Sequence, residues 1–402
     1  MFVVNEKDQG VPIKIWLRDE SEVEESWMDQ AKSVSRLPFV FRHIALMPDV
    51  HAGYGLPIGG VAAFEDVLSP FSIGYDIGCG MRFVETNVDV NVVREEELRN
   101  IVERIVSKVP VGMSNHSVKQ TSEVLDSLYR NDIDVSEFKE EVENAYYQIK
   151  TVGSNNHFIE LQKDNRGKLC IMVHTGSRNF GYRIADKYIK KAEEKNKMWY
   201  SNVPKGLNFL PVNSKEGEEY LFWMRVALNW AKENREKIMN VVKNELEEMY
   251  GDVFFGEDID VHHNYASLEN HFNKNVWVHR KGAVCVRKGM YGLIPGAMGA
   301  ESYVVKGIGN KESFHSCSHG AGRTMSRRKA EEILDEEEVL EDLNKKGLVT
   351  NKREENIVSE SRFSYKDINE VIENQVDLVE PVKKLTSIAT IKKVEGKKKK
   401  KK

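Results

Sequence analysis

Three histidines, an aspartate and a cysteine lie in short glycine- or asparagine-rich segments that could hold metal ions. His157 lies in GSNNHFIE, His174 in VHTGSRN and His263 in DVHHNYAS. In YDIGCG, two residues separate Asp76 from Cys79, so a tight turn can direct both side chains at one point. Carboxylate, thiolate and neutral imidazole groups are ligands of divalent transition metals. The pattern therefore predicts a metal site assembled from these segments.

The spacing of these residues does not identify the metal. By ligand chemistry alone, a set of cysteine, histidine and aspartate favours zinc, because thiolate is soft and manganese prefers oxygen. One thiolate can also bridge two cations. A single histidine is more often structural than a ligand, so the interpretation depends on several of them occurring in similar polar settings.

A second group of segments could bind phosphate. HGAGRTMSRR places two glycines, Arg323 and Arg327 directly after His319, and these two arginines would share a face if the segment opens a helix. Backbone N–H groups at a helix N-terminus and the arginine fork both bind anions. HTGSR supplies Arg178, and HRKGA supplies Lys281, although an exposed basic patch explains HRKGA equally well. The chain has no GxxxxGK[ST] loop, so a nucleotide would have to be bound in another way.

The elements that must position these residues begin with two glycine-dense segments, 44–64 and 71–88. Both predict strands joined by tight turns. Such glycine density does not help packing, but it makes sense where backbone closely approaches a ligand. Turns alone do not require Asp49 and His51, which lie in the first segment. We therefore expect this region to contribute to the site.

Helices and strands alternate through the rest of the chain. Charged amphipathic helices are predicted over 90–149, and strands near 157–162 and 168–176. A long helix is predicted over 218–250, in which Trp223 and Trp230 share a face that belongs to the core.

The remaining sequence returns to short strands over 251–322 and then becomes charged and mainly helical over 326–382. No linker interrupts the chain, and the candidate site residues come from both halves. We expect one α+β domain over 1–392, followed by a disordered lysine-rich tail over 393–402.

Composition excludes several classes of protein. With 40% hydrophobic and 30% charged residues among 402, the chain is typical of a globular enzyme. The net charge of -4 excludes a uniformly basic nucleic-acid binder, so any RNA contact must come from local arginine and lysine clusters. No apolar run reaches the roughly 18–20 residues that span a bilayer, and the start does not resemble a secretory signal. We expect a cytoplasmic protein without a membrane partner, whose four cysteines are free thiols.

Ten motifs together resemble the RtcB family of RNA-splicing ligases. In order they are DVHAGYGLPIGG, DIGCGM, NHFIE, HTGSR, HHNYA, HRKGA, IPGAMG, SYVV, SHGAGRTMSR and SYKDI. Several are rare, and their joint occurrence in this order makes chance similarity improbable. The resemblance covers nearly the whole chain and implies a single large α+β domain with mixed β-sheets, surface helices and a central metal-containing cleft.

The resemblance also implies a centre of two manganese ions. Its ligands would be Asp76, Cys79, His157, His174 and His263. The cysteine would bridge the ions, with Asp76 and His157 on one ion and the other two histidines on the second. His263 is preferred to its neighbour His262 because the family histidine directly precedes an asparagine.

The implied reaction starts at His319, which would attack the α-phosphate of GTP to give a covalent histidine–GMP and pyrophosphate. GMP would pass to an RNA 3′-phosphate, and a 5′-hydroxyl would then attack the activated end. The implied nucleotide contacts are Asn156, Glu160, Asn264, Ser302, Gly320, Ala321, Gly322, Tyr365 and Lys392. The implied RNA-phosphate contacts are Arg178, Arg323 and Arg327.

Two other functions fit parts of the pattern. A metal-dependent RNA cyclic phosphodiesterase or phosphatase would keep the metal ligands but would have no use for His319. A non-catalytic RNA-binding or chaperone-like protein would need neither the metal ligands nor His319.

For the ligase, the expected partners are GTP and RNA with a 3′-phosphate or 2′,3′-cyclic phosphate end and a 5′-hydroxyl end, in tRNA splicing or RNA repair. A monomer is expected, and the need for an activating protein is left open.

Overall fold

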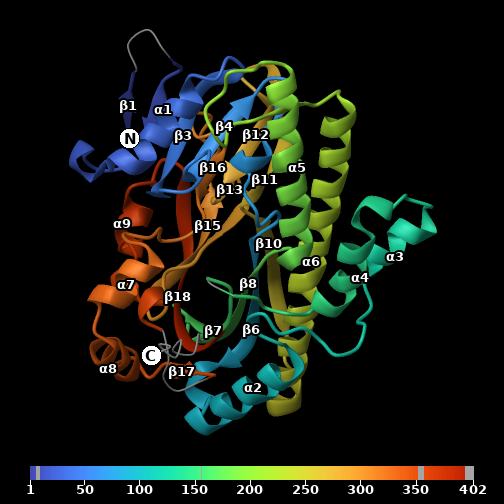
Figure 1. Cartoon of the computed structure of the whole chain (residues 1–402). Helices are drawn as coiled ribbons and strands as arrows, with labels where there is room; N and C mark the ends of the chain where they lie inside the picture. Colours follow the sequence, from blue (N-terminus) through green and yellow to red (C-terminus); the bar gives the residue numbers. More distant parts are fainter. Residues whose placement is uncertain (6–9, 155, 352–356, 394–402) are drawn as a thin grey trace, which may run out of the picture.

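The computed structural model describes residues 1–5, 10–154, 156–351 and 357–393 of the chain. The tail predicted over 393–402 lies outside the described residues except for Lys393. Within the described ranges, mixed sheets and helices form the predicted α+β fold (Figure 1).

The glycine-dense segment 44–64 forms the centre of an N-terminal sheet. The strand order is β1-β2-β3-β4-β12-β11, in which β2 and β3 are parallel and the other neighbours antiparallel. These strands are β1 (Phe2–Val4), β2 (Ile13–Ile15), β3 (Val40–His51), β4 (Ile58–Phe64), β11 (Asn264–His271) and β12 (Lys274–Lys281). Helix α1 (Glu25–Ser35) packs on β3. Distant parts of the chain therefore share one sheet.

A second sheet has the order β10-β6-β8-β7-β18-β15-β14, with β17 beside β18. Its strands are β6 (Gly80–Asp89), β7 (Phe158–Asp164), β8 (Lys168–Thr175), β10 (Phe255–His262), β14 (Tyr291–Ile294), β15 (Glu301–Gly307), β17 (Val349–Thr350) and β18 (Val379–Lys392). The strands predicted near 71–88, 157–162 and 168–176 are thus confirmed. Because β6, β8 and β7 are neighbours, the loops at one end of these strands meet.

The main hydrophobic core joins the two sheets. Met47 of β3 and Val61 of β4 belong to the same buried cluster as Met81 of β6 and Met172 of β8. Two short pairs complete the strands, β5 (Val67–Leu68) with β9 (Leu210–Pro211), and β13 (Ala283–Cys285) with β16 (Ser316–Ser318). Strand β16 ends directly before His319 and thereby anchors that residue to the core.

Two long helices, α5 (Arg178–Met198) and α6 (Lys215–Tyr250), run side by side along one flank of the molecule (Figure 1). Helix α6 confirms the prediction over 218–250, and Trp223 and Trp230 are buried in the core as expected. Helix α5 was not predicted. Helices α2 (Glu95–Lys108), α3 (Glu123–Arg130) and α4 (Lys139–Gln148) confirm the amphipathic helices over 90–149. In the described part of the chain, no helix is both long and apolar enough to span a membrane.

The prediction that 326–382 is mainly helical is confirmed only in part. The segment contains the short helices α7 (Arg327–Ile333), α8 (Glu336–Lys345) and α9 (Ile368–Glu373), with the 3-10 turns η5 (Val358–Glu360) and η6 (Arg362–Ser364) between them. The chain then enters β18, whose later residues are buried between β7 and β15. Because the first half of β18 is charged and exposed, its sequence pattern does not resemble a core strand.

Candidate active site

The register of the second sheet brings the predicted metal ligands to one end of the strands. Cys79 directly precedes β6, whose first residue pairs with the last residue of β8. His174 of β8 pairs with the first residue of β7, which directly follows His157. Strand β10 ends opposite the start of β6, so His263 follows at the same end. Side chains that are far apart in the sequence are therefore neighbours.

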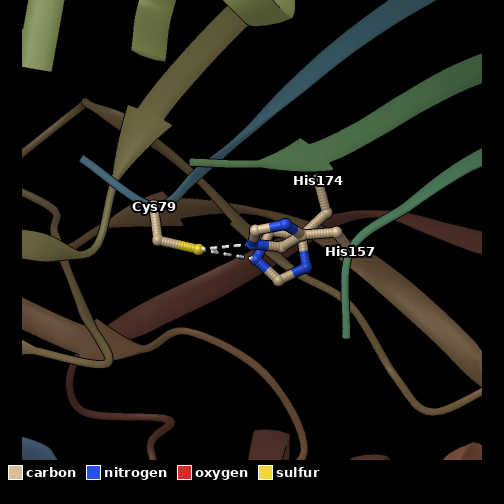
Figure 2. Close-up of side chains that lie close together, drawn as sticks. All are labelled: Cys79, His157 and His174. Atoms are coloured by element: carbon tan, nitrogen blue, oxygen red, sulfur yellow. Dashed lines mark hydrogen bonds between the residues drawn. The ribbon is translucent and has the colours of Figure 1, made fainter. Parts of the chain in front are cut away.

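The thiol of Cys79 points toward two imidazoles (Figure 2). Its Sγ is 3.3 Å from Nε2 of His157 and 3.3 Å from Nε2 of His174. Oδ2 of Asp76 lies 3.0 Å from the same Nε2 of His157. The sulfur and the two imidazoles could together hold a metal ion, because their ligand atoms all lie within 4.8 Å of one another.

His263 lies beside this group. Its ring centroid lies 5.2 Å from that of His174 and 4.9 Å from that of His319. Its neighbour His262 has a different environment, since Nδ1 of His262 lies 3.2 Å from the guanidinium of Arg235. Within the described residues, the buried Nδ1 atoms of His157 and His263 have no hydrogen-bond partner. The orphaned Nδ1 of His263 fits a site that binds a cation, whereas in His157 it is Nε2 that faces the Cys79 thiol.

The electrostatics of the group also fit cation binding. Burial lowers the pKa of His174 and His263 well below the ordinary value, so both imidazoles are neutral and able to bind a metal. Burial, together with the Asp76 carboxylate, raises the pKa of the Cys79 thiol. A bound cation reverses that effect and stabilises the thiolate. His174 also donates from Nδ1 to the carbonyl of Asn156 at 3.0 Å, which leaves Nε2 as the ligand atom.

His319 is held by a buried carboxylate that the sequence did not connect with it. Nδ1 of His319 lies 2.6 Å from Oδ2 of Asp49, which also accepts from the backbone N–H of His319 and of Gly320. Burial works to raise the pKa of Asp49, but attraction to the His319 imidazole outweighs it, and the pKa is lowered. An Nδ1–H donated to Asp49 leaves the lone pair on Nε2, which is the arrangement of an oriented nucleophile.

A single cavity of about 690 Å³ is lined by the candidate metal ligands and by His319. Sixteen of the predicted site residues line it: Asp76, Cys79, Asn156, His157, Glu160, His174, His263, Asn264, His319, Gly320, Ala321, Gly322, Arg323, Arg327, Tyr365 and Lys392. Ser302 and Arg178 do not line it. Asn264 joins the two groups, because it donates to the carbonyl of Asp76 at 3.1 Å and accepts from the N–H of Gly282 at 2.8 Å. Gly282 in turn packs against the ring of His319.

Glu360 is a site residue that the sequence analysis missed. Its carboxylate accepts from Lys392 at 2.7 Å, from the hydroxyl of Tyr365 at 2.9 Å and from Nε of Arg327 at 2.9 Å. Arg323 reaches the same carboxylate at 3.3 Å. The two arginines share one motif, Tyr365 lies five residues after the glutamate, and Lys392 comes from β18, so no single motif contains the group. Helix α7 begins at Arg327, so the expectation that a helix presents both arginines on one face is wrong.

The two predicted residues outside the cavity have internal partners. Arg178, at the start of α5, donates to Thr151 at 3.1 Å and to the carbonyl of Gly112 at 2.8 Å. The hydroxyl of Ser302 accepts from the N–H of Gly296 at 3.2 Å. Both side chains therefore stabilise loops at the border of the cavity.

Comparison with known proteins gives a consistent result over nearly the whole chain. The family model described as "tRNA-splicing ligase RtcB" matches residues 30–393. The chain is 33% identical to the RNA-splicing ligase RtcB of Escherichia coli (strain K12), over 96% of this chain and 98% of that protein. It is 32% identical to the tRNA-splicing ligase RtcB of Pyrobaculum aerophilum, over 96% and 95% of the two chains. Identity to the tRNA-splicing ligase RtcB of Thermococcus kodakarensis is 31%, over 92% and 91%.

Proposed function

Because the chain belongs to the tRNA-splicing ligase RtcB family, we propose that it joins RNA ends through a covalent histidine–GMP intermediate. The substrates are GTP and RNA that carries a 3′-phosphate or 2′,3′-cyclic phosphate on one end and a 5′-hydroxyl on the other. The observation that carries this proposal is the contact of His319 Nδ1 with the buried Asp49 carboxylate, beside the candidate metal ligands. A hydrolase that only opens cyclic phosphates would not need an oriented imidazole there.

Asp76, Cys79, His157, His174 and His263 would hold two divalent ions, which we propose to be manganese. Bound divalent cations neutralise charge on the α-phosphate and orient it for in-line attack. Nε2 of His319 attacks that phosphorus, the bond to the departing pyrophosphate breaks, and Asp49 stabilises the cationic imidazole. GMP then passes to the RNA 3′-phosphate, and attack by the 5′-hydroxyl releases GMP and joins the strands.

The other cavity residues bind the nucleotide and the RNA. We assign the nucleotide to Asn156, Glu160, Asn264, Ser302, Gly320, Ala321, Gly322, Tyr365 and Lys392. The cavity is lined by all of these except Ser302, which supports the assignment. We assign RNA phosphates to Arg178, Arg323 and Arg327, of which Arg327 has the most exposed side chain, at 40%. The guanidinium forks of these residues suit phosphate oxygens.

The test is incubation with manganese and GTP that is labelled on the α-phosphate. We expect label on the wild-type protein, its loss in His319→Ala, and normal metal content in that variant. His116→Ala is a matched control, because His116 does not line the cavity and bonds to the carbonyl of Lys150.

Two results would contradict the proposal in different ways. Label retained by His319→Ala would refute the assignment of the nucleophile. A wild-type protein that opens a 2′,3′-cyclic phosphate but never acquires label would be a phosphodiesterase and not a ligase.

A further inference from the structure

A row of four aromatic rings leads from the mouth of the cavity to helix α5. Tyr54 and Phe71 are stacked, with centroids 5.8 Å apart and ring planes 7° apart. Phe71 meets Tyr75 edge to face at 5.5 Å, and Tyr75 stacks on Tyr182 of α5 at 5.0 Å. Tyr54 and Tyr75 line the same cavity as His319. The row therefore extends the wall of the candidate active site toward the outer surface.

Tyr54 is the exposed end of this row. Its side chain is 72% exposed although it lines the cavity, and the ring rests with one face on Phe71. Single exposed aromatic residues are common on protein surfaces, so exposure alone carries no conclusion. What sets Tyr54 apart is that a stacked partner orients its ring beside a candidate active site.

The loop that carries Tyr54 is fixed at several points. Gln30 exchanges two hydrogen bonds with Gly53, donating to its carbonyl at 2.6 Å and accepting from its N–H at 3.1 Å. Nζ of Lys281 donates to the carbonyl of Tyr54. Gly55 has a φ of 69°, and a Cβ there would lie 2.7 Å from the carbonyl of Gly206. An exposed ring on a fixed backbone is preorganised for a ligand, because little freedom remains to be lost on binding.

The position of the row beside the candidate active site favours a nucleic acid as this ligand. Lys281 fixes Phe71, because its buried Nζ lies 5.3 Å from the centroid of the Phe71 ring and donates to the carbonyl of Phe71 at 3.2 Å. Burial lowers the pKa of Lys281 to about 7, so this side chain contributes little positive charge. The next residue, Gly282, is so close to His319 that a Cβ there would lie 2.9 Å from Cε1 of the imidazole. Arg183, which follows Tyr182 in the sequence of α5, is exposed. Aromatic rings beside cationic side chains are the usual means of binding unpaired nucleotides.

We propose that Tyr54, supported by Phe71, is a stacking platform for an unpaired nucleobase next to the RNA end that enters the cavity. This inference rests on the proposed ligase function. Stacking is tolerant of sequence, since every base has a π face, and it therefore suits an enzyme that selects its substrate by the chemistry of the ends. The base belongs either to the strand with the 3′-phosphate or to the strand with the 5′-hydroxyl.

The experiment measures RNA binding and ligation separately. Binding is measured with two unpaired RNA strands. One ends in an unreactive 3′-hydroxyl in place of the 3′-phosphate, and the other begins with a 5′-hydroxyl. Each strand is tested with and without its terminal base. Tyr54→Ala should weaken binding of one of these strands by about 5- to 150-fold and raise the KM for ligation to a similar extent. Tyr54→Phe should restore both values. The salt dependence of binding should not change, because no charge is removed.

Removal of the terminal base completes a double-mutant cycle. If the base stacks on Tyr54, its removal weakens binding to the wild-type protein but has no further effect on Tyr54→Ala. The strand that responds identifies the source of the base. Tyr129→Ala is the matched control, since Tyr129 is 49% exposed on α3 and does not line the cavity. It should behave as wild type.

The outcomes separate the platform from the ligase. Any one of three results would overturn the platform while wild-type ligation stands. They are binding by Tyr54→Ala within twofold of wild type for both strands, fully additive effects in the double-mutant cycle, and no rescue by Tyr54→Phe. A wild-type protein that acquires no GMP and joins no RNA would refute the proposed function. If such a protein also bound RNA without regard to Tyr54, the platform would be refuted independently.

Discussion

His174 and His319 each use Nδ1 in a hydrogen bond, with the carbonyl of Asn156 and with Asp49 respectively. Each therefore presents Nε2 for chemistry, one as a candidate ligand atom and the other as the proposed nucleophile. The two partners differ in charge. A backbone carbonyl orients a neutral imidazole, whereas a carboxylate also stabilises the positive charge that develops on His319 during attack.

The negative charge of Asp49 should contribute more to the rate of the His319 reaction than the shape of its side chain. We predict that Asp49→Asn slows formation of the His319–GMP adduct by about 10²- to 10⁴-fold, because the amide does not stabilise the cationic imidazole. Labelled GTP measures the rate, and metal content should stay at the wild-type level. Asp258→Asn is the control, since Asp258 pairs with Arg82 on the surface. An adduct rate within threefold of wild type in Asp49→Asn would show that the carboxylate is not needed.

At the scale of elements, the junction between β8 and α5 leaves room for Asp76, a proposed metal ligand, only because the junction contains glycine. A Cβ on Gly176 would lie 2.1 Å from Oδ1 of Asp76. Real Cβ atoms do not approach other atoms so closely, so a larger residue must displace the carboxylate. The φ of Gly176 is not positive, and alanine is therefore compatible with the backbone itself.

Gly176→Ala should accordingly act on the metal site and not on the fold. We predict a 10- to 100-fold loss of metal affinity, of the order seen when residues around metal ligands are changed, as measured by metal titration. Gly256→Ala on β10 is the control, because the nearest atom to its Cβ would be 3.8 Å away. Unchanged affinity in Gly176→Ala would mean that Asp76 is not a ligand.

The C-terminal elements are joined by one buried carboxylate. Burial works to raise the pKa of Glu360, but attraction to Lys392 and Arg327 outweighs it and lowers the pKa to about 2 from the ordinary 4.5. The folded protein thus keeps this group charged at a pH where an unfolded chain protonates it. Its contribution to stability is fully present above about pH 4.5 and is lost as the pH falls toward 2.

Glu360→Gln should therefore destabilise the protein in a pH-dependent way. We predict a loss of about 1–3 kcal/mol in the free energy of unfolding at pH 7, because four donors lose their anionic partner. Urea unfolding at pH 3 should give a smaller difference in the free energy of unfolding between Glu360→Gln and the wild-type protein than at pH 7. Glu332→Gln, which removes an exposed pair with Arg328, should change stability by less than about 0.5 kcal/mol. A difference that does not depend on pH would refute the charge-based explanation.

At the scale of the whole molecule, the candidate metal ligands couple segments that lie far apart in the sequence, between residues 76 and 263. Cys79 precedes β6, His157 precedes β7, and His263 follows β10. A ligand that binds only the folded state stabilises all of it. Metal binding at these residues should therefore raise the resistance of the entire domain to unfolding.

We predict that manganese or zinc at 100 times its dissociation constant stabilises the wild-type protein by about 2.7 kcal/mol. Thermal unfolding with and without metal measures this as a rise in Tm. The rise should vanish in Cys79→Ala and persist in Cys170→Ala, which removes a buried cysteine of β8 that does not line the cavity. Equal metal-induced shifts in the two variants would exclude Cys79 as a ligand.

Much of the secondary structure could be predicted because local patterns carry it. The long apolar face of α6 and the strands near 157–162 and 168–176 are visible as periodicity. Helix α5 was missed, since part of its buried face consists of small residues such as Ala185 and Ala192 among many lysines and glutamates. Strand β18 was missed because its burial depends on β7 and β15, which are distant in the sequence.

The sequence by itself determined the membership of the family, the types of the candidate ligands and the candidate nucleophile, because rare motifs preserve residue type and order. Tertiary structure alone decided which partner each side chain has. Asp49 and His319 are 270 positions apart, and Glu360 gathers side chains from three other segments. No local pattern encodes such contacts, since they arise from the register of strands and the packing of loops. The aromatic row that begins at Tyr54 likewise exists only in the folded molecule.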